Sequence, residues 1–173
     1  EDIESATVVR VQSRSNTLFN GNTRLEPKVI LADSLFFRTM GIEVLKGNPH
    51  ELGNPETMFI SESFARKAFG NEDPIGKVLL YKRSFPMTVK GVYADIPENS
   101  SLRHDVVISF ATIIKYEWEC VSWTCGDSFE GYIRLKETGS LEKVNSRIDK
   151  VIEKYLPFDL ENDGFGMRYS LQP

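Results

Sequence analysis

The clearest hydrophobic pattern of the chain lies in residues 58–76, which read MFISESFARKAFGNEDPIG. The stretch opens with a short apolar run of strand type, and either Ser61 or Ser63 can cap a helix that follows it. The apolar residues of that helix are spaced four apart and therefore share one face, namely Phe64 with Ala68 and Ala65 with Phe69. Gly70 and Asn71 then favour a left-handed stop, and Pro74 and Gly76 turn the chain towards a new strand. The pattern predicts a strand–helix–turn joint without an evident catalytic group.

A second helical pattern covers residues 140–156. Its apolar positions recur at spacings of three and four, and they are Leu141, Val144, Ile148, Val151, Ile152 and Tyr155. Ser140 is placed to cap this helix and Pro157 to end it. The opposite face carries acidic and basic side chains, for which a solvated surface is a simpler interpretation than a docking site.

The remaining pattern alternates strands with short helices. Strands are predicted at residues 6–13, 28–32, 42–45, 58–60, 77–82, 87–94, 105–110, 132–136 and 166–172. Short helices are predicted at 34–40, capped by Asp33 or Ser34, and at 111–119, whereas 15–23 is predicted to be a turn-rich loop. Gly91 interrupts a strand pattern, which indicates a bulge or a close approach of two backbones. Interleaved helices, strands and hairpins predict an α+β fold with mixed or antiparallel sheets.

Length and charge narrow the classes of function. A chain of 173 residues corresponds to about one domain and needs no metal to bury a core. Its net charge of −4 argues against nucleic acid as a partner, because phosphate binding needs a concentrated basic surface. The longest apolar run, residues 106–114, is about half of what a membrane span requires. No cofactor is predicted, since the chain lacks a phosphate-binding P-loop, a dinucleotide-binding glycine motif and a zinc-protease motif.

The chain contains two cysteines, Cys120 and Cys125. Their spacing does not fit a CxxC redox or zinc motif, and the two histidines of the chain are distant in sequence. Two alternatives remain, a local disulfide formed in an oxidising compartment or a pair of free thiols.

Candidate catalytic and metal-binding residues are few. Ser100 or Ser101 with His104, and Asp95 nearby in sequence, could form a hydrolase site only if folding brought hydroxyl, imidazole and carboxylate together. Because neighbours on an extended loop usually point apart, a polar connection before a strand is the preferred interpretation. The acidic pair at residues 72–73 could attract a cation, but a solvated turn is again preferred, and no metal site is predicted.

Four stretches resemble, in order, the extracytoplasmic domain of MacB/FtsX-type ABC transporter permeases. They are LADSLFFRTMGIEVLKGNP, MFISESFARKAFGNEDPIGKVL, MTVKGVYADIPENSSLRHDVVISF and the closing MRYSLQP. Together they cover more than half of the chain and are most similar to permeases of Bacteroides-like bacteria. The residues that carry this signature are Ser61, Glu62, Phe64, Ala65, Phe69, Gly70, Pro74, Gly76, Gly91 and Asp95. The cysteine pair is not part of it.

The resemblance implies a bilobed, non-enzymatic domain outside the inner membrane, with a porter-like lobe and a small inserted α/β lobe. We expect the porter-like lobe at residues 1–31 with 100–173 and the inserted lobe at 32–99. The implied partners are transmembrane helices flanking Glu1 and Pro173, a cytoplasmic ABC ATPase, a second copy in the full-length protein, and a periplasmic adaptor or outer-membrane channel. The implied role is to couple ATP hydrolysis to substrate expulsion or signalling outside the membrane. The alternative is a free-standing periplasmic module that binds a peptide or a lipid.

Overall fold

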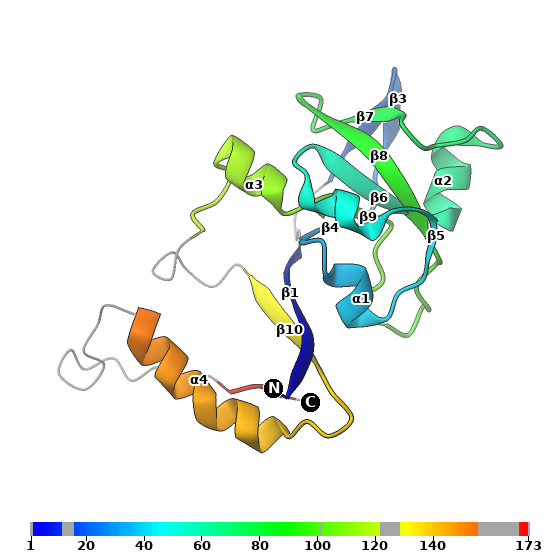
Figure 1. Ribbon diagram of the computed structural model, residues 1–173. Helices are drawn as coiled ribbons and strands as arrows, with labels where there is room; N and C mark the ends of the chain where they lie inside the picture. The colour runs from blue at the N-terminus through cyan, green and yellow to red at the C-terminus, as the bar shows by residue number, and fades with distance from the viewer. Residues whose placement is uncertain (1, 12–15, 101, 122–128, 156–169, 173) are drawn as a thin grey trace.

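The computed structural model describes residues 2–11, 16–100, 102–121, 129–155 and 170–172 (Figure 1). The helices are α1 (Phe36–Met40), the 3-10 helix η1 (Pro49–Gly53), α2 (Glu62–Phe69), α3 (Ala111–Tyr116) and α4 (Leu141–Tyr155). The strands are β1 (Ile3–Val11), β2 (Leu18–Asn20), β3 (Thr23–Leu25), β4 (Val29–Ala32), β5 (Val44–Gly47), β6 (Thr57–Ser61), β7 (Val78–Tyr81), β8 (Phe85–Tyr93), β9 (Val106–Ser109) and β10 (Glu130–Leu135). In this part of the chain, no helix has the length and apolar character needed to cross a membrane.

All ten strands belong to one sheet, in the order β10-β1-β4-β9-β6-β8-β7-β2-β3, with β5 paired to β8. The pairs β4–β9 and β6–β8 are parallel, whereas the other pairs are antiparallel. A mixed sheet with packed helices confirms the predicted α+β class.

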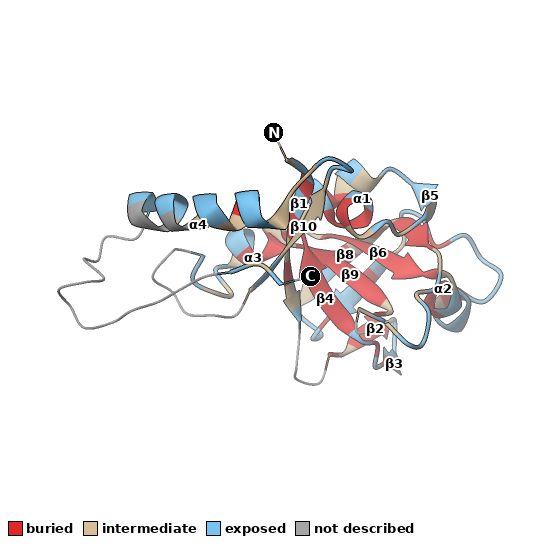
Figure 2. Ribbon diagram, turned by 90° about the horizontal axis from the view of Figure 1, so that it is seen from below, coloured by how far each residue is buried: buried red, intermediate tan, exposed pale blue. Residues whose placement is uncertain are grey.

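Helices cover both faces of the central strands, and two hydrophobic clusters result. On one face Phe36 and Phe37 of α1 and Leu52 of η1 pack against the sheet. On the other face α2 and α3 contribute their apolar residues, Phe64, Ala65, Phe69 and Ile113. Strands β4, β6 and β9 are buried along their whole length, which explains their continuous apolar runs (Figure 2).

The end of the sheet formed by β1 and β10 is different. Figure 1 shows these two strands and α4 extending away from the body that contains β2–β9. Of the side chains described in α4, Val144 is buried, whereas Val151 is 45% exposed. As predicted, Ser140 caps the helix, because its Oγ accepts a hydrogen bond from Lys143 N at 3.4 Å.

Three local predictions need correction. The predicted loop at 15–23 contains strand β2 and the start of β3, which form a hairpin around Gly21 (φ 57°) and pair with β7. A three-residue strand has too little pattern to be recognised, and its partner β7 lies far away in sequence. Helix α1 begins after Leu35 and has no side-chain cap of its own. The Asp33 carboxylate accepts hydrogen bonds from Leu35 N, before the helix, and from Thr7 Oγ1 and Val8 N of β1. The strand predicted at 42–45 lies two residues later, as β5.

Two further predictions are not decided by the described residues. The closing strand at 166–172 falls largely outside them, and residues 170–172 form no regular element. The two-lobe division also stays a prediction, because one sheet contains strands from both proposed parts, and β2 and β3 lie at the opposite end of the sheet from β1 and β10.

Candidate functional site at the start of helix α2

Ser61 connects strand β6 to helix α2. It is the last residue of the fully buried strand, and its Oγ accepts a hydrogen bond from Phe64 N at 3.2 Å. This bond satisfies one of the amide groups that an α-helix leaves unpaired in its first turn. Glu62 begins the helix and forms an i,i+4 ion pair with Arg66 at 2.8 Å. The capping role predicted for Ser61 is therefore confirmed.

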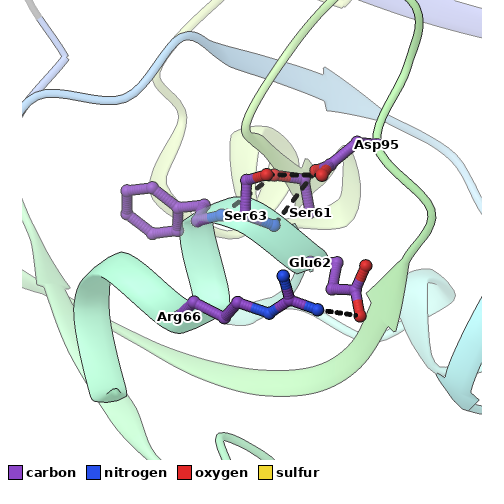
Figure 3. Close-up of polar contacts among 6 residues, drawn as sticks. Ser61, Glu62, Ser63, Arg66 and Asp95 are labelled. Carbon is purple, nitrogen blue, oxygen red and sulfur yellow. Dashed lines mark hydrogen bonds and ion pairs between the residues drawn. The ribbon is translucent and has the colours of Figure 1, made fainter. Parts of the chain in front are cut away.

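A second carboxylate reaches the same helix end from the segment that follows β8. Asp95 Oδ1 accepts a hydrogen bond from Ser63 N at 3.0 Å, and Ser63 Oγ is hydrogen-bonded to Asp95 Oδ2 (Figure 3). A negative charge at this position also interacts favourably with the positive end of the helix dipole. Asp95 therefore ties the start of α2 to the end of β8.

The pKa of Asp95 reflects this arrangement. Partial burial raises the pKa, but hydrogen bonds from Ser63 and Ser61 and the positive charge of Arg66 outweigh it and lower the pKa below its usual value. The carboxylate is thus held in the ionised form that the helix end requires.

These residues form one wall of a polar cavity of about 280 Å³. The cavity is lined by Ser61, Ser63, Asp95, Ile96, Pro97, Glu98, Arg103, His104 and Asp105. Most of its charged groups already have partners within the protein: Arg103 pairs with Glu98 at 2.8 Å, and the Asp105 carboxylate accepts a hydrogen bond from Lys28 N at 2.7 Å. The polar groups of the cavity are therefore used mainly to hold the connection between β8 and β9.

The geometry does not assemble the hydrolase considered from the sequence. His104 Nδ1 lies 2.8 Å from Leu102 O, and Ser100 Oγ accepts a hydrogen bond from Leu102 N at 3.2 Å, so within the described residues no bond joins Ser100 to His104. Ser101 lies outside the described residues. Burial lowers the pKa of His104, and its carbonyl accepts a hydrogen bond from Tyr93 Oη at 2.8 Å. These contacts give the segment a positioning role, whereas a nucleophile would need a base at its hydroxyl.

Gly91 has the close contact predicted from its sequence. A Cβ atom at this position would overlap the ring of Phe59, and it would lie 2.8 Å from Lys46 O. The ladder between β6 and β8 shifts register between Met58 and Phe59, which is the predicted bulge. Glycine is needed here because two neighbouring strands and an aromatic ring meet at one point.

The turn that follows α2 ends the helix at a glycine, as predicted, but Gly70 has ψ −121° and therefore does not adopt the predicted left-handed helical conformation. Gly70 (φ 64°) and Gly76 (φ 79°) adopt positive φ values that favour glycine. The acidic pair between them forms ion pairs, Glu72 with Lys77 and Asp73 with Lys46. In the part of the chain that the structure describes, no group of three or more metal-ligating side chains occurs.

Two larger cavities flank the connection between α1 and β5. One of about 390 Å³ has a mainly apolar wall that includes Leu35, Phe37 and Ile42, and one of about 400 Å³ lies between Ile42 and the segment after β8. Ile42 belongs to both walls. Cavities of this size can hold a small ligand.

The Asp95–Ser63 contact was not predicted, although both residues attracted attention separately. An aspartate 32 positions after the serine gives no local signal, and only the parallel pairing of β6 with β8 brings the two together. The second half of the predicted cysteine pair, Cys125, lies outside the described residues, so the disulfide with Cys120 stays a prediction. Mass measurement after alkylation, with and without a reductant, would test it.

Comparison with known proteins identifies one family for this chain. Residues 1–151 match the profile of a family described as the MacB-like periplasmic core domain. No curated protein matches the chain.

Solved structures show the same fold. A domain of a protein assigned as a permease in Porphyromonas gingivalis has a TM-score of 0.77 and 26% identity, over 93% of this chain and 74% of that one. The periplasmic region of MacB from Actinobacillus actinomycetemcomitans has a TM-score of 0.65 and 16% identity, over 88% and 67%. The extracellular domain of the ABC-type transporter YknZ from Gram-positive bacteria has a TM-score of 0.62 and 15% identity, over 100% and 83%. The latter two likenesses concern the fold alone.

Proposed function

The chain belongs to the family of MacB-like periplasmic core domains, and from this premise we propose that it transmits motion in an ABC-type permease. It is the periplasmic domain of such a permease. In the proposed mechanism a cytoplasmic ABC ATPase hydrolyses ATP, transmembrane helices on either side of the domain move, and the domain converts that movement into expulsion of a substrate or a signal outside the inner membrane. The domain itself carries out no chemical step.

The observation that carries this proposal is the family match across residues 1–151, which includes the whole central sheet. The site geometry supports it, since Ser61, Ser63 and Asp95 connect α2, β6 and β8 through hydrogen bonds instead of activating a hydroxyl. Apolar packing on both faces of the sheet makes the body stiff enough to move as a unit.

The proposal can be tested in the full-length permease together with its ATPase. A spin label at Leu45, which is 44% exposed on strand β5, reports the distance between the two copies of the domain in a homodimer. We expect ATP binding to shift this distance and an ATPase variant that cannot bind ATP to abolish the shift. The isolated domain, which we expect to be monomeric in light scattering, is the control. An assembly that hydrolyses ATP with an unchanged distance would refute the proposal.

The alternative of a peptide- or lipid-binding module is favoured by the two cavities beside α1. Titration with a fluorescent fatty acid and with a fluorescent apolar peptide would test it. Because Ile42 lines both cavities, the larger side chain of the variant Ile42→Trp should obstruct them. Saturable binding that Ile42→Trp abolishes would support this alternative, and absence of saturable binding to the wild type would exclude it.

A further inference from the structure

Helix α4 contacts the segment of residues 170–172 through Asn145. Asn145 Oδ1 accepts a hydrogen bond from Leu171 N at 2.8 Å, and Asn145 Nδ2 donates one to Leu171 O at 3.4 Å. One amide side chain thus satisfies both backbone groups of one residue, as a neighbouring strand would. Figure 1 shows the segment of residues 170–172, in red, beside α4, to which these two hydrogen bonds attach it.

The same helix also contacts the start of the sheet, at Asp2, through Arg147. Arg147 Nη1 forms an ion pair with Asp2 Oδ2 at 3.1 Å, and the Asp2 side chain is only 14% exposed. The Asp2 carbonyl accepts a hydrogen bond from Lys136 N at 3.0 Å. A Cβ atom at Gly139 would lie 2.6 Å from that carbonyl, so the turn before α4 needs glycine to admit residue 2.

Asn145 and Arg147 lie two positions apart on the helix. At 3.6 residues per turn, side chains with this spacing point about 200° apart and therefore leave opposite sides of the helix. The incoming and outgoing segments are held on different sides of the first two turns of α4, and the helix lies between them.

The rest of α4 has few contacts with the core. Among its described side chains Val144 is the buried one, and in Figure 2 most of the helix is exposed. Its ties to Asp2 and Leu171 are therefore a large share of what positions its first turns.

We propose that α4 is a crossbar that fixes the spacing and register of two chain segments, the one at Asp2 and the one at Leu171. A displacement of either segment passes through Asn145 or Arg147 to the other and to β10, which leads into the helix. The role of the crossbar in transmitting motion rests on the proposed function. Its role in holding the two segments does not.

Amide hydrogen exchange in the 173-residue chain tests the Asn145–Leu171 contact and the Arg147–Asp2 contact separately. We expect Asn145→Ala to speed exchange of the Leu171 amide about tenfold, because the amide loses its acceptor, and to leave the Lys136 amide unchanged. Arg147→Gln should speed exchange of the Lys136 amide and leave Leu171 unchanged. Ser146→Ala is the matched control, since its exposed Oγ donates only to Lys143 O within the helix. Equal exchange at Leu171 in Asn145→Ala and Ser146→Ala would overturn the proposal.

Spin labels at Ile3 and Gln172 test whether α4 fixes the distance between the segment at Asp2 and the segment at Leu171. The distance distribution should be narrow in the wild type and in Ser146→Ala, and should broaden in the double variant Asn145→Ala/Arg147→Gln. An unchanged distribution in the double variant would overturn the crossbar. This result is independent of the Leu45 measurement in the ATPase assembly, so the crossbar and the proposed function can fail separately.

Discussion

The central body and the β1–β10–α4 end of the molecule are stabilised by different forces. In the body, β4, β6 and β9 are buried along their whole length between two hydrophobic clusters. At the end, β10 has intermediate or exposed residues throughout and α4 is tied to the chain ends by an amide side chain and an ion pair. Apolar packing on two sides gives one stiff arrangement, whereas a few polar contacts at a surface can be broken and remade at low free energy.

Several contacts connect the two regions, among them the β1–β4 ladder and the hydrogen bonds from Thr7 and Val8 to Asp33, and one more comes from β10. Arg134 of β10 donates a hydrogen bond from Nε to Thr39 O at 3.0 Å, near the C-terminus of α1. A Cβ atom at Gly41, the residue that ends α1 with φ 69°, would lie 2.6 Å from Arg134 Nη2. A positive charge is favourable near the C-terminal, negative end of a helix. Arg134 therefore links β10 to α1 of the body.

The largest effect is expected from removing an aromatic side chain from the body. Phe64 of α2 is 3% exposed within the larger hydrophobic cluster. We expect Phe64→Ala to lower the free energy of unfolding by about 3–5 kcal/mol through lost burial and a residual cavity. Urea denaturation followed by circular dichroism measures this. An unchanged midpoint would show that the body is not the stiff region.

The next largest loss of stability is expected from adding one methyl group at Gly91, where β5, β6 and β8 come close together. Gly91→Ala would place a Cβ atom against the Phe59 ring and close to Lys46 O, which belongs to backbone and cannot easily move. We expect a loss of about 1–3 kcal/mol in the same denaturation experiment. Gly131→Ala is a matched control in β10, since nothing lies within 4 Å of a Cβ atom there. Equal losses in both variants would contradict the close-contact explanation.

An intermediate effect is expected at the α2 cap. Asp95→Asn should destabilise the fold by about 1 kcal/mol near neutral pH, because a charged acceptor at the helix end is lost.

The difference between wild type and Asp95→Asn should depend on pH in a defined direction. The folded pKa of Asp95 lies below the ordinary aspartate value of 3.8. Its stabilisation is therefore complete above the unfolded pKa and disappears as the pH falls through the lower folded pKa. Urea denaturation at a series of pH values should show the gap closing below about pH 4. A gap that widens on acidification would contradict the assigned role.

The smallest effect is expected on α4. Val151 is 45% exposed, so Val151→Ala should change the free energy of unfolding by less than about 0.5 kcal/mol. Together with Phe64→Ala, this variant tests the contrast between the regions directly. A loss as large as that of Phe64→Ala would show that α4 belongs to the core.

Local patterns predicted most elements of the body and the long helix, because apolar periodicity is visible wherever burial is continuous. Residues 58–76 gave a strand, a Ser61-capped helix and a glycine-ended turn, and the structure has all three. The hairpin of β2 and β3 was missed because Leu18, which is fully buried, owes its burial to β7 and not to its own neighbours.

The amino-acid sequence by itself determined the family, the α+β class, the cap at Ser61 and the need for glycine at position 91. These features depend on residue type and short spacing, which are legible along the chain. Only the tertiary structure decided that Asp95 would cap α2 together with Ser61, that Arg134 would reach α1, and that Asn145 and Arg147 would hold the two ends of the chain. Each of these contacts joins residues at least 26 positions apart, since Asn145 and Leu171 are 26 apart and Asp95 and Ser63 are 32 apart. Such polar pairs leave no periodic trace, because their partners meet only after the sheet has set the register of its strands.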